Sequence, residues 1–296
     1  MSATIINSFQ LATNNSNIYG GFFVFITGVI GNILNIIIFT SLKTFRQTSA
    51  AFYMTTASIV NIFQLVVGLL SRILITGYNI DPTKTSSFIC KARTFTLTTT
   101  MLTTFMCMCF AAIDQYLLLK HRWRHLCTVK AASRLIIVAF ILCLLHGIPV
   151  LLFQDLELSS STGQTTCGFT NTGFSIYYSR FLFPVLLGFL PLIIRVCFGI
   201  LAFINVHHFN NRETPIVRLE RDKQLTKMVL VEVVVDVFLT LPYSIYNHLY
   251  SSSVTFTNAV DSAENQFIIA VTRIVFYGNF AVSVDLMKSM GVKNCG

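Results

Sequence analysis

Apolar residues along the chain gather in long runs that are separated by short polar connections. The runs cover Ile18–Leu42, Ala51–Thr76, Cys90–Leu119, Ser133–Phe153, Ser179–Val206, Gln224–Leu249 and Gln266–Met287. A helix needs about 20 predominantly apolar residues to cross the hydrocarbon core of a bilayer, and each run meets that length. The pattern predicts an all-α membrane protein with a seven-transmembrane helix bundle over residues 18–288, a tail at 1–17 and a short tail at 289–296.

The first run could be either a transmembrane helix or a signal peptide that is cleaved off. The run is longer than the 7–15-residue apolar core of a cleaved signal peptide, and a polar stretch without charge precedes it. We therefore expect it to remain as the first transmembrane helix.

The composition indicates a membrane protein, in which the positive net charge reports the orientation of the helices and not a nucleic-acid partner. The chain has 296 residues, of which 54% are hydrophobic and 11% charged, whereas soluble domains carry about 25% charged residues. A net charge of +9 would suggest a nucleic-acid partner for a soluble protein. Here 14 lysines and arginines fall on one side of the predicted membrane and 6 near the other. The positive-inside rule then places the N-terminus outside and the C-terminus inside, in a multi-pass protein of the plasma membrane without a nucleic-acid partner.

Two further patterns fit an external N-terminal side. Asn14-Asn15-Ser16 is a glycosylation sequon, with Asn14 as the acceptor, although so short a pattern is common by chance. Of the 8 cysteines, six lie inside the runs or on the inner side. Cys90, at the outer end of the third run, and Cys167, in the second outer loop, are the two candidates on the outer side. An oxidising compartment would favour a disulfide between them, which would tie the third helix to the second outer loop. The alternative is a pair of free thiols.

Several short motifs carry a resemblance to a known family. They are Gly31-Asn32 in the first run, Cys90 at the head of the third run with Asp114-Gln115-Tyr116 near its end, Pro191 in the fifth, and Pro242-Tyr243 in the sixth. Together they resemble the rhodopsin-like (class A) G-protein-coupled receptors over essentially the whole chain. The resemblance implies a receptor for an extracellular ligand that activates heterotrimeric G proteins and is not an enzyme. It implies a coupling surface formed by Asp114, Gln115, Tyr116, Arg122 and Arg124.

The chain also departs from the family pattern. Gln115 replaces the arginine of the Asp-Arg-Tyr motif, and Asn61 replaces an aspartate, so that no formal charge remains there for a bound sodium ion. Asn279-Phe280 stands in place of Asn-Pro in the last run. We interpret the chain as a divergent member and expect no cofactor or metal.

Polar residues within the runs need partners, because the bilayer core offers none. We expect Asn32, Asn61 and Asn279 to form a polar core that joins the first, second and seventh helices. This core would either take part in a conformational switch or serve only as a contact between helices. Asp114 can reach Arg122 or Arg124, unless it is an ordinary solvated helix end.

Ionisable residues in the fifth and sixth runs are more unusual. Arg195 and Glu232 lie at similar depth in consecutive antiparallel helices, which predicts an ion pair, with Asp236 sharing the arginine or protonated. The pair would act as a latch between these helices or as a purely structural contact. Pro242 interrupts the backbone hydrogen bonds of the sixth helix and predicts a hinge.

The ligand cavity is expected between the outer halves of the third, fifth, sixth and seventh helices. Its candidate residues are Arg93, Thr96, Thr100, Tyr177, Asn247 and Arg273. The outer half of the third run has no acid to bind an amine, and the seventh has no lysine to carry retinal, which argues against both ligands. Acidic and basic residues both occur at the predicted rim, and this mixture favours a peptide.

Other classes of protein fit less well. The chain has no phosphate-binding glycine-rich loop and no Cys-x-x-Cys or His-Glu-x-x-His metal motif. A transporter or channel could use Arg195, Glu232 and Asp236 as a charged pathway, but the halves show no internal symmetry. A decoy or degenerate receptor that binds ligand without coupling stays open, because of Gln115 and the short C-terminal tail. Basic residues on the inner side would also contact membrane lipid.

Overall fold

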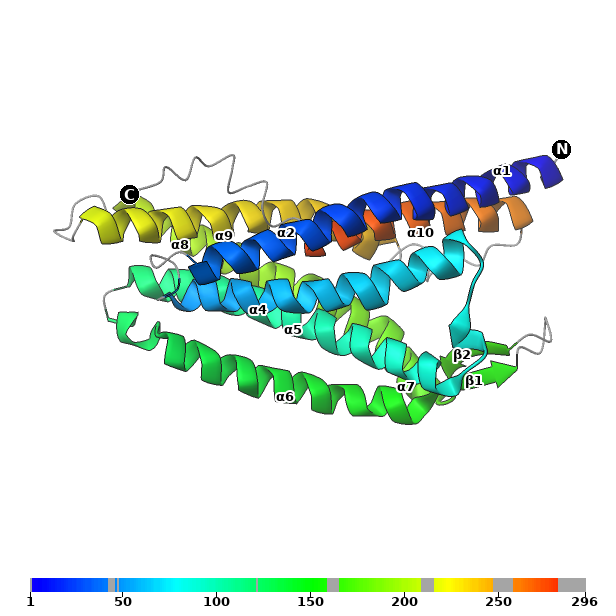
Figure 1. The fold of residues 1–296 in the computed structure, drawn as a ribbon, viewed down its shortest axis with the longest axis horizontal. Coiled ribbons are helices and arrows are strands. Elements are labelled where there is room, and N and C mark those ends of the chain that lie inside the picture. The colour runs from blue at the N-terminus through cyan, green and yellow to red at the C-terminus, as the bar shows by residue number, and fades with distance from the viewer. Residues whose placement is uncertain are drawn as a thin grey trace.

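The computed structural model is a bundle of long helices that run along one axis (Figure 1). It describes residues 2–41, 46, 48–120, 122–158, 165–208, 216–246 and 258–281. The α-helices are α1 (Ser2–Asn15), α2 (Gly21–Ser41), α4 (Ser49–Gln64), α5 (Ser87–Leu119), α6 (Val129–Phe153), α7 (Thr172–Tyr177), α8 (Leu190–His208), α9 (Ile216–Tyr243) and α10 (Ala259–Tyr277). Wider π-helical turns at Ser16–Gly20, Leu65–Leu70, Ile73–Gly77 and Tyr178–Phe189 continue several of them, and short 3₁₀ turns occur at Pro82–Lys84, Arg124–Leu126 and Gly278–Phe280.

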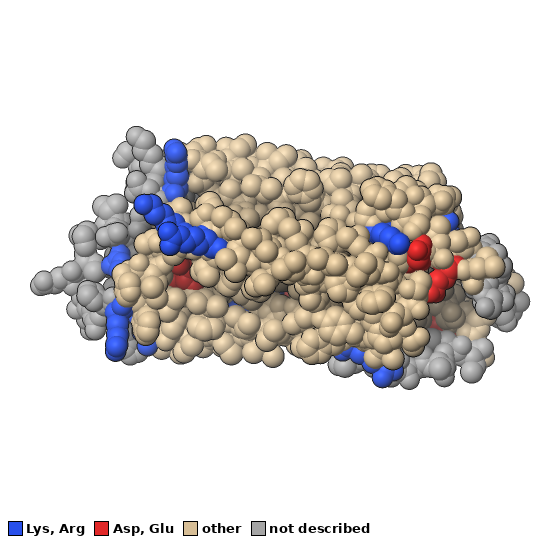
Figure 2. Space-filling view, turned by 90° about the horizontal axis from the view of Figure 1, so that it is seen from below, with Lys and Arg blue, Asp and Glu red and all other residues tan. Residues whose placement is uncertain are grey.

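The helices have the length and composition of membrane spans, which confirms the predicted all-α membrane fold. Among the described residues, 6 continuous helices are long and apolar enough to cross a bilayer. The described part of α10 carries Asp261, Glu264 and Arg273 and is not among these 6, and the predicted seventh run extends beyond it to residue 287. Figure 2 shows charged side chains gathered at the two ends of the bundle, with a wide belt almost free of them between. The direction in which the bundle is inserted stays a prediction.

One end of the bundle carries a β-hairpin, and we call it the hairpin end. Strands β1 (Gln154–Leu158) and β2 (Thr165–Phe169) pair antiparallel, and Leu156 lies opposite Cys167. The opposite end, where α5 finishes, is called the Asp114 end. Side-chain caps fix where several helices begin: Ser86 accepts a hydrogen bond from the backbone N–H of Ile89 at the start of α5, and Thr128 accepts one from Ala131 at the start of α6.

The N-terminal segment assigned to a tail is helical. Helix α1 continues through Ser16–Gly20 into α2, and it packs along α10, where the rings of Phe9 and Phe267 lie 6.2 Å apart. Asn14 is half-buried within α1. Its glycosylation stays a prediction.

The polar core forms as expected in part. Asn61 Nδ2 donates to Asn32 Oδ1 at 3.4 Å, and Asn32 Nδ2 donates to the carbonyl of Phe280 at 2.7 Å. Asn279, however, donates to Thr240 Oγ1 of α9 at 2.8 Å. The first and seventh helices therefore meet through a backbone carbonyl, because the Asn279 side chain points to α9 instead.

A close backbone approach supports this contact. A Cβ atom added at Gly28 would lie 2.7 Å from Leu65 Cδ1 and 2.9 Å from the Cβ of Ala281. Only glycine leaves room for three segments to meet here. Pro242 lies inside α9, one residue before its end, so the carbonyl of Phe238 lacks its usual helical donor. A hinge motion at this point stays a prediction.

Candidate functional site

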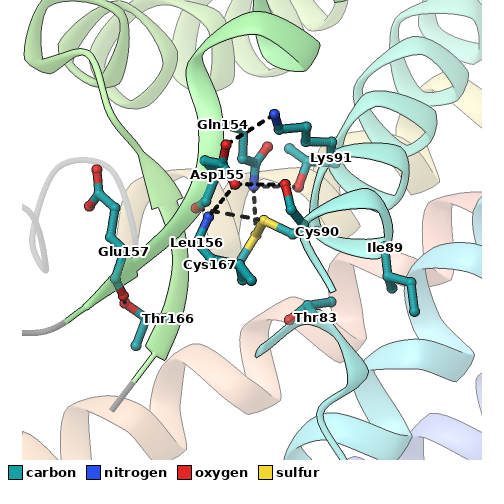
Figure 3. Close-up of a disulfide and its surroundings, with 12 residues drawn as sticks. Thr83, Ile89, Cys90, Lys91, Gln154, Asp155, Leu156, Glu157, Thr166 and Cys167 are labelled. Carbon is teal, nitrogen blue, oxygen red and sulfur yellow. Dashed lines mark hydrogen bonds and ion pairs between the residues drawn. A yellow bond between two sulfur atoms is a disulfide. The ribbon is translucent and has the colours of Figure 1, made fainter. Parts of the chain in front are cut away.

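A disulfide at the hairpin end joins α5 to β2 and confirms the predicted pairing (Figure 3). The Cα atoms of Cys90 and Cys167 are 5.8 Å apart, and Cys90 is fully buried. Gln154 of β1 donates to Thr94 Oγ1 of α5 at 2.8 Å. The hairpin is therefore attached to α5 by a covalent bond and a hydrogen bond one turn apart.

A half-buried ion pair lies beside the disulfide (Figure 3). Asp155 of β1 lies 3.1 Å from Lys91 Nζ and accepts a hydrogen bond from Ser87 Oγ at 2.6 Å, both in α5. The bonds from Ser87, the backbone of Leu156 and Lys91 lower the pKa of Asp155 to about 2. Its carboxylate therefore stays charged throughout the physiological range.

This lowered pKa gives the hairpin a pH dependence. A carboxyl with a lowered folded-state pKa stabilises the fold fully above its ordinary value of about 4, and this contribution is lost as the pH falls through about 2. We expect the difference in unfolding midpoint between the wild type and Asp155→Asn to be constant from pH 7 to 5 and to shrink between pH 4 and 2. An equal difference at every pH would show that the bond to Ser87 acts without the charge.

A cavity of 190 Å³ opens near the hairpin end, between the second transmembrane helix, α5, α9, α10 and the turns at Tyr178–Phe189. Three arginines from different helices line it: Arg72, Arg93 and Arg273. The rings of Tyr178, Tyr243 and Tyr277 complete much of its wall. No carboxylate lines this cavity in the part of the chain that the structure describes.

The three guanidinium groups differ in their contacts. Arg93 Nε donates to Ser71 Oγ at 2.8 Å, and the guanidinium of Arg273 lies 5.8 Å from the centre of the Tyr243 ring. Arg72 Nε is buried without a hydrogen-bond partner among the described residues, and so is Nε2 of Gln64. Buried N–H groups without an acceptor are costly. The cavity thus has positive charge and spare donors, an arrangement suited to an anion.

Of the six residues predicted for the ligand cavity, two line the 190 Å³ cavity. Arg93 and Arg273 line the cavity, whereas Thr96, Thr100 and Tyr177 do not, and Asn247 lies outside the described residues. Thr100 Oγ1 donates to Gln64 Oε1 at 2.5 Å, and Tyr177 is hydrogen-bonded to His146 at 2.8 Å.

Helix phase explains these errors. On α5, Arg93, Leu97 and Met101 follow one another at intervals of four and share the cavity face. Thr96 and Thr100 precede Leu97 and Met101 by one position, which turns them away by about 100°. A periodicity analysis anchored on Arg93 would have selected the correct face. Gln64 and Arg72, eight residues apart on the second transmembrane helix, could have been found in the same way.

At the Asp114 end, the predicted coupling residues have contacts that differ from those expected. Ser49 Oγ of α4 donates to Asp114 Oδ2 at 2.6 Å, so the described partner of Asp114 is a hydroxyl group and neither Arg122 nor Arg124. The Arg122 guanidinium lies 5.8 Å from the centre of the Trp123 ring, and Arg124 begins a short 3₁₀ turn. Asp114 is buried, whereas Arg122 is exposed, because the connection after α5 turns away from the bundle.

The neighbours of Asp114 tie α5 to other segments. Burial, and then the nearby Asp114, raise the pKa of Cys127 to about 12, so the thiol stays protonated and donates to the Asp114 carbonyl at 3.6 Å. Gln115 is buried, and its Oε1 accepts a hydrogen bond from Thr226 Oγ1 of α9 at 3.1 Å. The Tyr116 ring packs edge-on against Phe198 of α8.

The ion pair between the fifth and sixth transmembrane helices exists with a different partner. Arg195 of α8 contacts Asp236 of α9, and both side chains are buried. An ion pair of Arg195 with Glu232 is not formed, although Glu232 is close enough to interact electrostatically. The Arg195 guanidinium also lies 5.5 Å from the centre of the Phe105 ring in α5. The predicted Arg195–Glu232 pair is therefore wrong, and the predicted contact between these helices holds through Asp236.

Comparison with known proteins agrees with this architecture. A family model described as the 7 transmembrane receptor (rhodopsin family) matches residues 31–282. Similar proteins include lysophosphatidic acid receptor 6 of Gallus gallus, 28% identical over 79% of this chain and 76% of the relative. They also include somatostatin receptor type 2 of Mus musculus, 30% identical over 49% of this chain and 40% of the relative, and type-1 angiotensin II receptor A of Xenopus laevis, 23% identical over 76% and 62%.

The match over most of the chain shows the family and confirms the predicted resemblance. This chain belongs to the rhodopsin family of seven-transmembrane receptors. It is a multi-pass membrane receptor and not an enzyme.

Proposed function

We propose that the chain is a receptor of the plasma membrane that binds an extracellular ligand in the arginine-lined cavity and activates a heterotrimeric G protein at the Asp114 end. One observation carries the proposal. The same helix, α5, lines the cavity through Arg93 and contacts α9 through Gln115, about 33 Å away along the helix axis. A ligand that shifts α5 relative to α9 at one end would act on the contact at the other.

The charge of the cavity favours a ligand with an anionic group. The acids that suggested a mixed rim, Asp155, Glu157, Asp261 and Glu264, do not line the cavity. Asp155 pairs with Lys91 instead. The relatives' names include receptors for a lipid, lysophosphatidic acid, and for the peptides somatostatin and angiotensin II. A peptide with a free carboxylate and an anionic lipid both supply the required negative charge.

Two other functions have less support. A transporter would need a continuous charged pathway, yet Arg195 and Asp236 neutralise each other within the bundle and are covered by apolar residues such as Phe105. A decoy receptor would bind ligand without coupling. Asp114 and Gln115 are hydrogen-bonded to α4 and α9, so they hold the ends of three helices together, and this arrangement favours a working inner face over a degenerate one.

Nucleotide exchange tests the proposal. The purified protein in lipid nanodiscs would be combined with a panel of G-protein α subunits, first without ligand and then with pooled peptide and lipid extracts. We expect exchange on at least one subunit, and its loss in Asp114→Ala. Folded protein that binds a ligand without exchange on any subunit would favour the decoy.

The contact between Gln115 and Thr226 leads to a prediction about ligand-independent nucleotide exchange. Thr226→Val keeps the side-chain shape and removes the hydrogen bond, which is worth about 0.5–1.5 kcal/mol. We expect ligand-independent exchange to rise about two- to tenfold as α5 and α9 separate more easily. Thr56→Val is the matched control, because among the described residues the Thr56 hydroxyl donates to the carbonyl of Phe52 in its own helix and to no other segment. Unchanged basal exchange in Thr226→Val would rule out a restraining role for this contact.

A further inference from the structure

An apolar groove of 340 Å³ lies beside the cavity on the outer surface of the bundle. It is bounded by the second transmembrane helix, the turn at Pro82–Lys84 and the start of α5. Leu74, Phe88, Ile89 and Ala92 form much of its lining, and Phe88 is 79% exposed. Since the groove is open and apolar, it suits a hydrocarbon chain.

Arg93 connects the groove with the cavity. It lines both spaces, and its Nε donates to Ser71 Oγ, which lines the groove as well. The guanidinium therefore lies at the boundary between a cationic space and an apolar one. A ligand that touches Arg93 with its charged group has a direct route for an apolar part.

The cavity itself specifies the charged group. Arg72, Arg93 and Arg273 place three like charges around 190 Å³, and the buried N–H groups of Arg72 and Gln64 have no acceptor among the described residues. An oxyanion supplies both the opposite charge and several acceptor oxygens, and guanidinium groups bind carboxylate and phosphate in matching geometry.

Volume argues for a ligand that uses both spaces. Pockets for small molecules usually measure about 300–1,000 Å³, so the cavity alone has room for a head group only. The groove, at 340 Å³, lies at the lower end of that range, which suits one chain better than the two chains of a membrane phospholipid.

We propose that the ligand is an amphiphile with an anionic head group in the cavity and a single hydrocarbon chain in the groove, with Arg93 at the junction. This inference rests on the proposed function in one respect, that the cavity is the ligand site. The head group is a phosphate monoester or a carboxylate.

Direct binding tests this without any G protein, so a failure to couple does not affect the result. The probe is radiolabelled 1-oleoyl glycerol 3-phosphate, added to the full chain in phosphatidylcholine nanodiscs, with empty nanodiscs as the blank. Competitors separate the parts of the ligand: oleate carries a carboxylate head, glycerol 3-phosphate is the head alone, and monoolein is the chain without charge. We expect saturable binding, displaced by oleate or by the unlabelled probe at least tenfold more strongly than by either partial compound.

Variants then test whether the cavity binds the head group and the groove binds the hydrocarbon chain. Arg72→Gln and Arg273→Gln should weaken probe binding by about 10- to 100-fold, as expected for lost charged hydrogen bonds. Arg180→Gln is the matched control, because Arg180 is exposed at the same end and lines neither space. Ala92→Phe fills the groove and should weaken binding of the probe while leaving displacement by glycerol 3-phosphate unchanged. Val66→Phe, which adds the same ring at an exposed position outside the groove, should change nothing. Unfolding midpoints confirm that each variant is folded.

Three results would overturn the proposal. Equal affinity for glycerol 3-phosphate and the probe would show that the hydrocarbon chain does not bind in the groove. The arginine variants could bind the probe as the wild type does, which would exclude the cavity as the head-group site. Exchange driven by a peptide, with no binding of the probe or of oleate, would uphold the proposed receptor function and reject the amphiphile.

Discussion

Arg195→Met is expected to destabilise the protein by about 3–5 kcal/mol. The variant leaves the carboxylate of Asp236 buried without its partner, and removing one member of a buried ion pair has a cost of this size. The unfolding midpoint in detergent or nanodiscs measures the effect.

Two companion variants identify the cause. Arg195→Met combined with Asp236→Leu should recover most of the lost stability, because an apolar pair of similar volume replaces a buried ion pair at little net cost. Glu232→Gln should have a much smaller effect than Arg195→Met, since Glu232 forms no ion pair with Arg195. If Glu232→Gln were as harmful as Arg195→Met and the double variant did not recover, the arginine would depend on Glu232 and the assignment to Asp236 would be wrong.

Signalling separates a latch from a structural contact. A latch predicts that the stability-restored double variant shows raised basal nucleotide exchange, because α8 and α9 are no longer held by charge. A purely structural pair predicts basal exchange like that of the wild type in the same variant.

Replacing both Cys90 and Cys167 with serine should cost about 2–4 kcal/mol. The bond closes a loop over a sequence separation of 77 residues, for which chain entropy alone gives about 4.5 kcal/mol. The expected cost is smaller because the helices of a membrane protein persist in its unfolded state. The wild type in reductant should unfold at the midpoint of the double variant, which should itself be insensitive to reductant.

The same variant should weaken ligand binding. Gln154 of the hairpin donates to Thr94, which lines the cavity, so a loosened hairpin disturbs the cavity wall. Cys197→Ser is the matched control, because Cys197 is an exposed free thiol. A double variant that keeps the wild-type midpoint and ligand affinity would show that the hairpin is held by its other contacts alone.

The number and order of the spans could be predicted because a bilayer imposes a minimum apolar length on each of them. The helix at residues 2–15 could not, since its sequence is polar enough to be read as a tail. Its packing depends on α10, more than 240 residues away, as the contact of Phe9 with Phe267 shows. Contacts of that kind leave no periodic signal in either segment alone.

The sequence allowed the types of residue in the candidate site to be predicted, but not the helix face on which each residue lies. Arg93, Thr96, Thr100 and Arg273 were all chosen for their depth in the outer halves of the helices, without regard to the turn of each helix, and only the two arginines line the cavity. The partner of Arg195 shows a second limit. Glu232 and Asp236 lie one turn apart, about 5–6 Å along the axis, and helix ends estimated from sequence are uncertain by as much. Depth alone could not decide between them.

The unbroken helix at the start of the chain has a consequence for how a ligand arrives. Ala3–Ser41 spans 39 residues, about 58 Å at 1.5 Å per residue, which is nearly twice the ~30 Å thickness of a bilayer core. Its first half must stand clear of the hydrocarbon, braced by α10, while the hairpin lies toward the other edge of the same end (Figure 1). Helices α1 and α10 therefore stand together along one side of the hairpin end. We therefore expect a ligand to reach the arginines from the side of the hairpin or out of the lipid, and not past α1.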